Sequence, residues 1–125
     1  ELHYGRDALA GVALLLTHLA QFGKPISWLR RSYPNYIISK NKIQLTPDID
    51  LELIFEKLAE KYSNEDLNRI DGLKINFESD WIHLRKSNTE PIIRIYSESS
   101  SEVTANNLAK KIQQDISQIL KGTAV

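Results

Sequence analysis

The 125-residue sequence contains no cysteine and no methionine. The absence of cysteine excludes disulfide bonds, zinc sites built on thiolates and cysteine nucleophiles. It is compatible with a reducing compartment, and we expect the protein to act in the cytoplasm. Charge of one sign is also lacking, because sixteen basic side chains balance sixteen acidic ones. No overall field therefore draws the chain to nucleic acid or to an anionic membrane, and any anion-binding site must be local.

Long uninterrupted apolar runs are absent too. The most apolar stretch is LAGVALLLTHLAQFG at residues 9–23, which polar side chains interrupt and which is shorter than the about 20 residues of a membrane span. It also lacks the basic flank of a signal peptide. We expect a buried helix here and no membrane association. Because the chain starts at Glu1, without methionine and almost at this helix, we expect an excised piece of a larger protein.

The first part of the chain has helical character throughout. Apolar side chains recur at helical spacing over residues 7–22, and a second short helix is expected from an N-cap at Ser27 to about Ser32. Strand-like sequence follows at once. We therefore place a domain boundary that divides the chain into residues 1–35 and 36–125.

The second part contains strand-like runs joined by short links. The runs lie at residues 35–45, 68–70, 73–78, 81–85 and 91–98. Asp71-Gly72 is a dipeptide typical of a hairpin turn. Hairpin-length links favour antiparallel pairing. We predict an α+β fold with a mostly antiparallel sheet of about four strands, covered on one face by two helices.

Both covering helices carry start signals. Thr-Pro-Asp at residues 46–48 predicts a capping threonine and a first-turn proline for a helix that ends near Tyr62. Ser99 and Glu102 have the spacing of a capping box, which predicts a last helix over residues 100–120. The expected core positions of the two helices are Leu51, Ile54, Phe55, Leu58 and Tyr62, and Val103, Leu108, Ile112, Ile116 and Ile119.

Charged side chains cluster around the stretch LRKSNTEPIIRIYSE at residues 84–98. In the strand WIHLR, the alternation of a strand sends Ile82 and Leu84 to one face and His83 and Arg85 to the other. In the next strand, Arg94 opposes the isoleucines on either side of it. Because the helices cover the apolar face, we expect these basic side chains on the open face.

The loop between these strands is rich in hydrogen-bonding groups. Its side-chain donors are Ser87, Asn88 and Thr89. A turn here can aim successive backbone amides into one concavity, and the fork of Arg85 can grip two oxygens at once. This combination is suited to holding a phosphate without a metal. Asn88 is the residue expected to adopt a positive φ angle in the turn.

A simpler interpretation remains open at this point. Ser-Asn-Thr runs between strands are commonly solvated turns, and Arg85 or Arg94 can pair with Glu90 or Glu98. His83 can hydrogen-bond a bound phosphate or merely fill the surface of the sheet. The residues alone do not decide between these interpretations.

The segment RKSNTEPIIRIYSE closely resembles the phosphate-binding signature of the α-D-phosphohexomutases, the family of phosphomannomutase, phosphoglucomutase and phosphoglucosamine mutase. Residues 70–85 resemble the hairpin that leads into this signature, and residues 2–36 resemble the closing helices of the third of the family's four domains. The resemblance implies that residues 1–35 belong to that third domain. It implies that residues 36–125 form the fourth domain, which has a TATA-binding-protein-like fold.

The resemblance also implies a reaction for the complete protein. In this family a phosphoserine of the first domain phosphorylates a hexose phosphate, a bisphosphate intermediate turns over, and the opposite phosphate returns to the serine. The last domain holds the phosphate that is not transferred, which would be the role of Arg85, Ser87, Asn88 and Thr89. The expected supporting groups are Arg94, Glu90 and His83.

The resemblance places the serine and the Mg²⁺ site upstream of this chain, so we expect no catalytic residue and no metal site in the fragment, which should be inactive alone. Its expected partners are the hexose phosphate and the upstream domains. We expect phosphomannomutase or phosphoglucomutase activity, with phosphoglucosamine mutase as the alternative.

Two other classes of protein are alternatives to a mutase domain. A stand-alone anion-binding module would keep the loop without the mutase, and the gene upstream of Glu1 discriminates between the two. An RNA-binding sheet is disfavoured by the zero net charge and by the lack of a stacking platform.

The histidines at positions 3, 18 and 83 match no metal-ligand spacing. A hinge is expected at residues 33–37.

Overall fold

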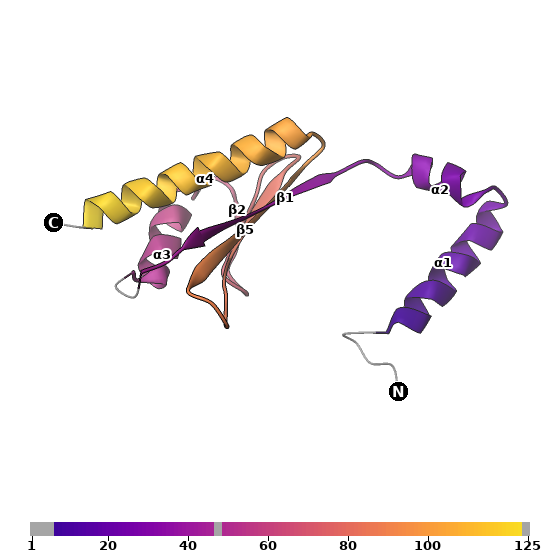
Figure 1. Cartoon of the computed structure of the whole chain (residues 1–125). Helices are drawn as coiled ribbons and strands as arrows, with labels where there is room; N and C mark the ends of the chain where they lie inside the picture. The colour runs from indigo at the N-terminus through magenta and orange to yellow at the C-terminus, as the bar shows by residue number, and fades with distance from the viewer. Residues whose placement is uncertain (1–6, 47–48, 124–125) are drawn as a thin grey trace. The chain divides into compact units, whose positions relative to one another are not determined.

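The computed structural model describes residues 7–46 and 49–123. The chain divides into two compact units, Glu1–Asn35 and Tyr36–Val125. In chain order the elements are α1 (Ala8–Phe22), α2 (Ile26–Ser32), β1 (Ile37–Gln44), α3 (Leu51–Lys61), β2 (Asp66–Asn68), β3 (Leu73–Asn76), β4 (Trp81–Lys86), β5 (Ile92–Ser99) and α4 (Glu102–Thr123). Figure 1 labels the helices and the strands β1, β2 and β5.

The first unit consists of α1 and α2. The Asp7 carboxylate accepts the Ala10 N–H at 2.9 Å and caps α1, and Gly23 ends it in the left-handed conformation at φ 66°. The N-cap of helix α2 lies two residues earlier than predicted, at Pro25 rather than Ser27. The Pro25 carbonyl accepts the N–H groups of Trp28 and Leu29, so the helical hydrogen bonding starts at the proline.

The prediction that α1 is buried is wrong for this chain. No residue of α1, which lies wholly within the described range, is buried, and the exposed fractions of Leu9 and Leu14 reach 82% and 73%. The physical reason is that α2, a seven-residue helix, is the element that packs on α1 within this unit, and α2 covers one side only.

In the described part of the chain no single helix is long and apolar enough to cross a membrane. Helices α1 and α2 meet the length and composition of a span only as a pair, which is bent by 95°.

The second unit is built on one sheet. Its five strands lie in the order β1-β5-β4-β3-β2, and every neighbouring pair is antiparallel. This confirms the α+β class and the antiparallel sheet, with five strands rather than about four. Strand β2 is displaced by two residues from its predicted position, to Asp66–Asn68. The register pairs apolar residues with apolar residues, as in Ile75 opposite Ile82.

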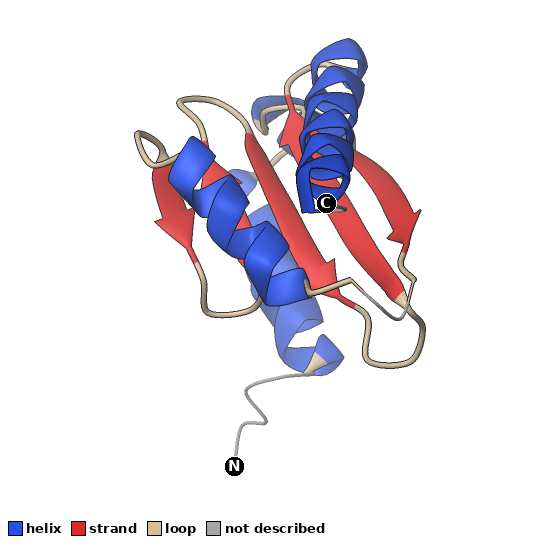
Figure 2. Ribbon diagram, turned by 90° about the vertical axis from the view of Figure 1, so that its left-hand side faces the viewer, coloured by secondary structure: helices blue, strands red, loops and turns tan. Residues whose placement is uncertain are grey.

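Helices α3 and α4 cover the same face of this sheet, as Figure 2 shows. Helix α4 packs on β1 and β5 and contacts α3. The buried core consists of Ile54, Phe55, Leu58, Tyr62, Leu73, Ile75, Ile82, Leu84, Ile93, Ile95, Ala109, Ile112 and Ile116. Val103 was predicted in this core but is 69% exposed, and Ala105 is buried instead. A small side chain at that position lets the helix approach the sheet closely.

The start of each covering helix differs from its prediction. Asp50 caps α3, because its carboxylate accepts the N–H groups of Glu52 and Leu53. Thr46 is therefore not the cap, and positions 47 and 48 lie outside the described residues. Ser101 caps α4 by accepting the Thr104 N–H at 3.1 Å. The predicted capping box of Ser99 with Glu102 is wrong, since Ser99 still belongs to β5.

Two serine hydroxyls tie α4 to the sheet. Ser39 donates to the side-chain oxygen of Asn106 at 2.6 Å, and Ser97 donates to the Ala105 carbonyl at 2.8 Å. Ser97 is fully buried, so its hydrogen bond offsets the desolvation of the hydroxyl. These contacts connect the amino-terminal half of α4 to β1 and β5.

A buried carboxylate joins α3 to α4. Asp115 accepts hydrogen bonds from Lys61 Nζ and from the Tyr62 hydroxyl, both at 2.7 Å. Burial of the Tyr62 phenol, together with its hydrogen bond and charge interaction with Asp115, raises its pKa well above the ordinary value of 10.0. The neutral phenol is thus the form that the native state requires.

Tyr62 should make the fold sensitive to alkali. The contribution of Tyr62 to the free energy of unfolding is complete below about pH 10. It declines as the pH rises further, because the phenol loses its proton in the unfolded chain but retains it in the folded chain. We expect Tyr62→Phe to be less stable at neutral pH by about 1 kcal/mol but to lose less stability than the wild type above about pH 10. Urea denaturation across this range measures both. Tyr36→Phe, at a position 56% exposed, serves as the control and should follow the wild type; an identical alkaline decline in Tyr62→Phe would contradict the assignment.

Candidate functional site

The hairpin of β4 and β5 places the predicted site residues. Arg85 lies directly opposite Arg94, and His83 lies directly opposite Tyr96. Directly opposite residues of neighbouring strands point to the same face of a sheet. Because Leu84 and its neighbours in β4 and β5 are buried under the helices, these basic side chains lie on the open face, as the alternation predicts.

A row of three cations crosses this open face. Lys42 of β1 lies opposite Arg94 of β5, which lies opposite Arg85 of β4. Like charges directly opposite each other destabilise a sheet. An anion bound across the row relieves that repulsion. The chain as a whole has zero formal net charge, so this face is a local positive region of the kind that anion binding requires.

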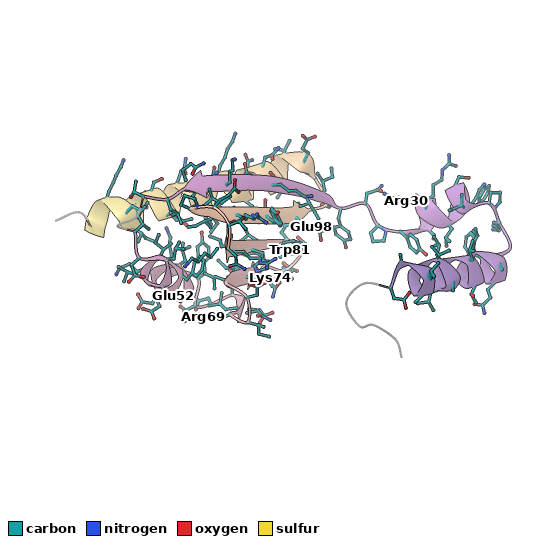
Figure 3. All side chains as sticks on the ribbon, turned by 60° about the horizontal axis from the view of Figure 1, so that its bottom comes forward. Arg30, Glu52, Arg69, Lys74, Trp81 and Glu98 are labelled. Carbon is teal, nitrogen blue, oxygen red and sulfur yellow. The ribbon has the colours of Figure 1, made fainter. Side chains whose placement is uncertain are left out.

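Figure 3 shows a second part of the same face, where Lys74, Trp81 and Glu98 lie close together. The Lys74 ammonium lies 4.7 Å from the centre of the Trp81 ring, whose Nε1–H donates to Glu98 at 2.9 Å. Glu98 is therefore engaged by Trp81. The arginine–Glu98 pairing that the sequence left open is not the arrangement found.

Arg85 instead contacts the β2–β3 turn. Its Nε lies 2.8 Å from the Asp71 carboxylate, and the two side chains are 48% and 61% exposed. His83 reaches the same residue, with Nε2 2.7 Å from the Asp71 carbonyl oxygen. Exposed ion pairs contribute about 0–1 kcal/mol to stability, so this pair orients the guanidinium but leaves it able to bind another anion. A guanidinium has five N–H donors, and this ion pair is made through Nε.

Ser87 is the buried member of the loop, with 6% of its surface exposed. Its backbone N–H donates to the Ile92 carbonyl at 3.0 Å. This amide therefore belongs to the strand pairing and is not one of the loop amides that were expected to bind an anion. Its hydroxyl receives a hydrogen bond from Arg94 Nη2 at 3.4 Å and lies 3.5 Å from the Thr89 hydroxyl. Ser87 therefore offers an anion its hydroxyl, beside a guanidinium.

The rest of the loop is exposed, including Asn88, Thr89 and Glu90. The expected positive φ of Asn88 is wrong: among the described residues, positive φ occurs only at Gly23 and Gly72. The physical reason is the length of the loop, since connections of four or five residues are commonly built around a type I turn without a left-handed residue. Hydrogen bonds thus join Ser87 to Thr89 and Arg94, whereas Arg85, although directly opposite Arg94, contacts Asp71 with its guanidinium as His83 does with its ring.

Three residues of this face were not predicted as part of the site, namely Lys40, Lys42 and Asp71. The alternation of side chains in the strand sequence SKNK, residues 39–42, is enough to predict that the two lysines lie on the same face of the sheet. Asp71 was identified only as a turn residue, because nothing in the sequence indicates which side chain of β4 the turn approaches. Within the described ranges, no group of three or more His, Cys, Asp or Glu side chains could hold a metal ion.

The fold and the site together define the class of domain: an α+β domain whose sheet has one open face that carries basic side chains. The family model "Phosphoglucomutase/phosphomannomutase, C-terminal domain" matches residues 45–114. This match covers more than half of the chain, and the chain therefore belongs to the phosphoglucomutase/phosphomannomutase family, whose C-terminal domain it contains.

The relatives agree on the family. The chain is 38% identical over 113 residues to a phosphoglucosamine/phosphogalactosamine mutase of Sulfurisphaera tokodaii, covering 89% of this chain and 25% of the relative. It is 34% identical over 120 residues to a phosphoglucomutase/phosphomannomutase of Thermococcus kodakarensis, covering 94% and 26%. A phosphomannomutase of Methanocaldococcus jannaschii is 28% identical over 119 residues, covering 95% and 26%. The chain thus spans about a quarter of the length of the curated relatives it matches.

The turn that carries Asp71 depends on Gly72. Its φ is 79°, and a Cβ added there would lie 2.1 Å from the Leu84 carbonyl oxygen. We expect Gly72→Ala to lower the free energy of unfolding by more than about 1 kcal/mol and to displace Asp71 from Arg85 and His83. Urea denaturation and the NMR shifts of the His83 ring measure the two effects.

Gly11→Ala is the matched control for Gly72→Ala. Gly11 lies in α1, an added Cβ there meets no atom within 4 Å, and alanine favours a helix by about 1 kcal/mol. This variant should leave the His83 shifts unchanged. Equal stability of Gly72→Ala and the wild type would contradict the close approach of the turn to β4.

Proposed function

We propose that this chain is the phosphate-anchoring C-terminal part of a phosphohexomutase, in which Arg85, Ser87, Asn88 and Thr89 hold the phosphate that is not being transferred. The observation that carries the proposal is the placement of Arg85 directly opposite Arg94 on the open face, with Arg94 hydrogen-bonded to the Ser87 hydroxyl of the adjoining loop. Family membership supports it, because every relative described above is named a mutase of a phosphorylated sugar.

A phosphate dianion can compete with Asp71 for Arg85 through charge and geometry. It carries more charge than the carboxylate, and it offers several oxygens to the guanidinium N–H groups, of which the Asp71 ion pair uses the one on Nε. A phosphate dianion can therefore recruit the guanidinium while the Asp71 contact through Nε is kept or released. The Ser87 hydroxyl and the exposed Asn88 and Thr89 side chains then supply further donors.

The proposed role of this domain is positioning. Binding energy from a part of the substrate that does not react orients the part that does. The phosphoserine and Mg²⁺ are proposed to come from upstream domains of the complete protein, which would interconvert hexose 1-phosphate and hexose 6-phosphate through a bisphosphate intermediate. The apolar surface of α1 is then proposed to pack against the rest of the third domain. The cytoplasm is the proposed compartment.

The sugar is proposed to be selected outside this chain. The names of the relatives differ in the sugar, which is glucosamine or galactosamine, glucose or mannose, but all share the phosphorylated hexose. This pattern fits a C-terminal domain that recognises phosphate alone. We propose a phosphomannomutase or phosphoglucomutase activity, with phosphoglucosamine mutase as the alternative, and a panel of hexose 1-phosphates assayed with the complete protein distinguishes them.

Arg85 is the residue whose loss tests the proposal. In the complete protein, Arg85→Ala should lower kcat/KM for hexose phosphate roughly 10- to 100-fold, because one charge-assisted contact contributes about 1.5–3 kcal/mol. Steady-state kinetics measures the change. Arg69→Ala removes an exposed arginine from the β2–β3 link and is the control. Kinetics of Arg85→Ala equal to those of Arg69→Ala would remove Arg85 from the site.

A further inference from the structure

A shallow concavity lies on the open face over β1 and β5, beside the loop site. Its volume is about 340 Å³, and its lining residues are Lys40, Asn41, Lys42, Glu90, Ile92, Arg94 and Tyr96. Strand β1 is not covered by the family match, which begins at residue 45. Two of the basic side chains of this concavity therefore come from an element outside the matched segment.

The charge of the concavity favours an anion. Three cations, Lys40, Lys42 and Arg94, face one carboxylate, that of Glu90. The Lys40 ammonium lies 5.8 Å from the centre of the Tyr96 ring, which holds it above the sheet. Lys42 lies directly opposite Arg94. Lysines on an edge strand also deter pairing with another sheet, but that role needs neither the ring contact nor a shared face with Arg94.

Arg94 connects this concavity to the loop. Its Nη2 donates to the Ser87 hydroxyl at 3.4 Å, and its strand lies between those of Lys42 and Arg85. Neighbouring strands are about 4.8 Å apart, so the backbones of Lys42 and Arg85 are separated by roughly 10 Å. The two groups of donors are therefore adjacent, and they share one arginine.

We propose that Lys40, Lys42 and Arg94 form a second subsite for phosphate groups, next to the loop site. It takes a phosphate monoester dianion more weakly than the loop, because its lysines are exposed point charges without a fork geometry. Its role is capture: a positive concavity raises the local concentration of a phosphorylated ligand and passes it to Arg85 and Ser87 through Arg94. This inference rests on the proposed phosphate-anchoring function.

The test is an NMR titration of the 125-residue chain with inorganic phosphate, at constant ionic strength maintained with sodium chloride. Two sets of backbone amide resonances should shift, each with its own midpoint. The amides of residues 85–90 should shift at lower phosphate concentration, and those of residues 40–42 and 94–96 at higher phosphate concentration. The double variant Lys40→Gln/Lys42→Gln should lose the second set and keep the first. Lys42→Arg should retain both.

Lys57→Gln removes an exposed lysine of α3, on the covered side of the sheet, and should change neither set. Shifts at residues 85–90 alone would overturn the second subsite and leave the proposed function intact. Shifts at neither set would overturn both. Shifts at residues 40–42 that persist in the double glutamine variant would also overturn the subsite, since the lysines would then not be its ligands.

Discussion

The packing of α3 and α4 against one face of the sheet is the constraint on which the rest depends. Side chains alternate between the two faces of a strand, so burying Leu84 and Ile95 under the helices fixes Arg85 and Arg94 on the other face. A register shift of one residue would bury both guanidinium groups. The apolar core thus determines the position of the cations, and with it the local positive field of a chain whose formal net charge is zero.

The basic side chains of the proposed site already have partners within the chain. Asp71 orients Arg85 through an exposed ion pair of small energy, while the buried Ser87 hydroxyl is reached by Arg94. These contacts limit the conformations of the donors before a ligand arrives. Such pre-organisation reduces the entropy that binding must overcome, which suits a domain proposed to hold a phosphate steady while chemistry occurs elsewhere on the sugar.

Alternation and the turn dipeptide made the sheet and its open face predictable from the sequence, because both are local patterns. The helix starts were less predictable: candidate caps lay within a few residues of one another, and strand β5, by continuing through Ser99, left Ser101 to cap α4. Val103 was misassigned because it lies two positions from Ala105, away from the helical stripe that Ala105, Ala109, Ile112 and Ile116 bury. The approach of Asp71 to Arg85 depends on which strand the turn meets, which only the folded sheet determines.

Family membership rests on the match to residues 45–114, and the proposed phosphate-anchoring role rests on the open face of the second unit. A crystal structure of the complete protein with a hexose phosphate bound tests that role most directly. The account predicts phosphate oxygens within hydrogen-bonding distance of the Arg85 guanidinium and the Ser87 hydroxyl. A substrate phosphate bound away from this face, with Arg85 contacting Asp71 alone, would contradict it.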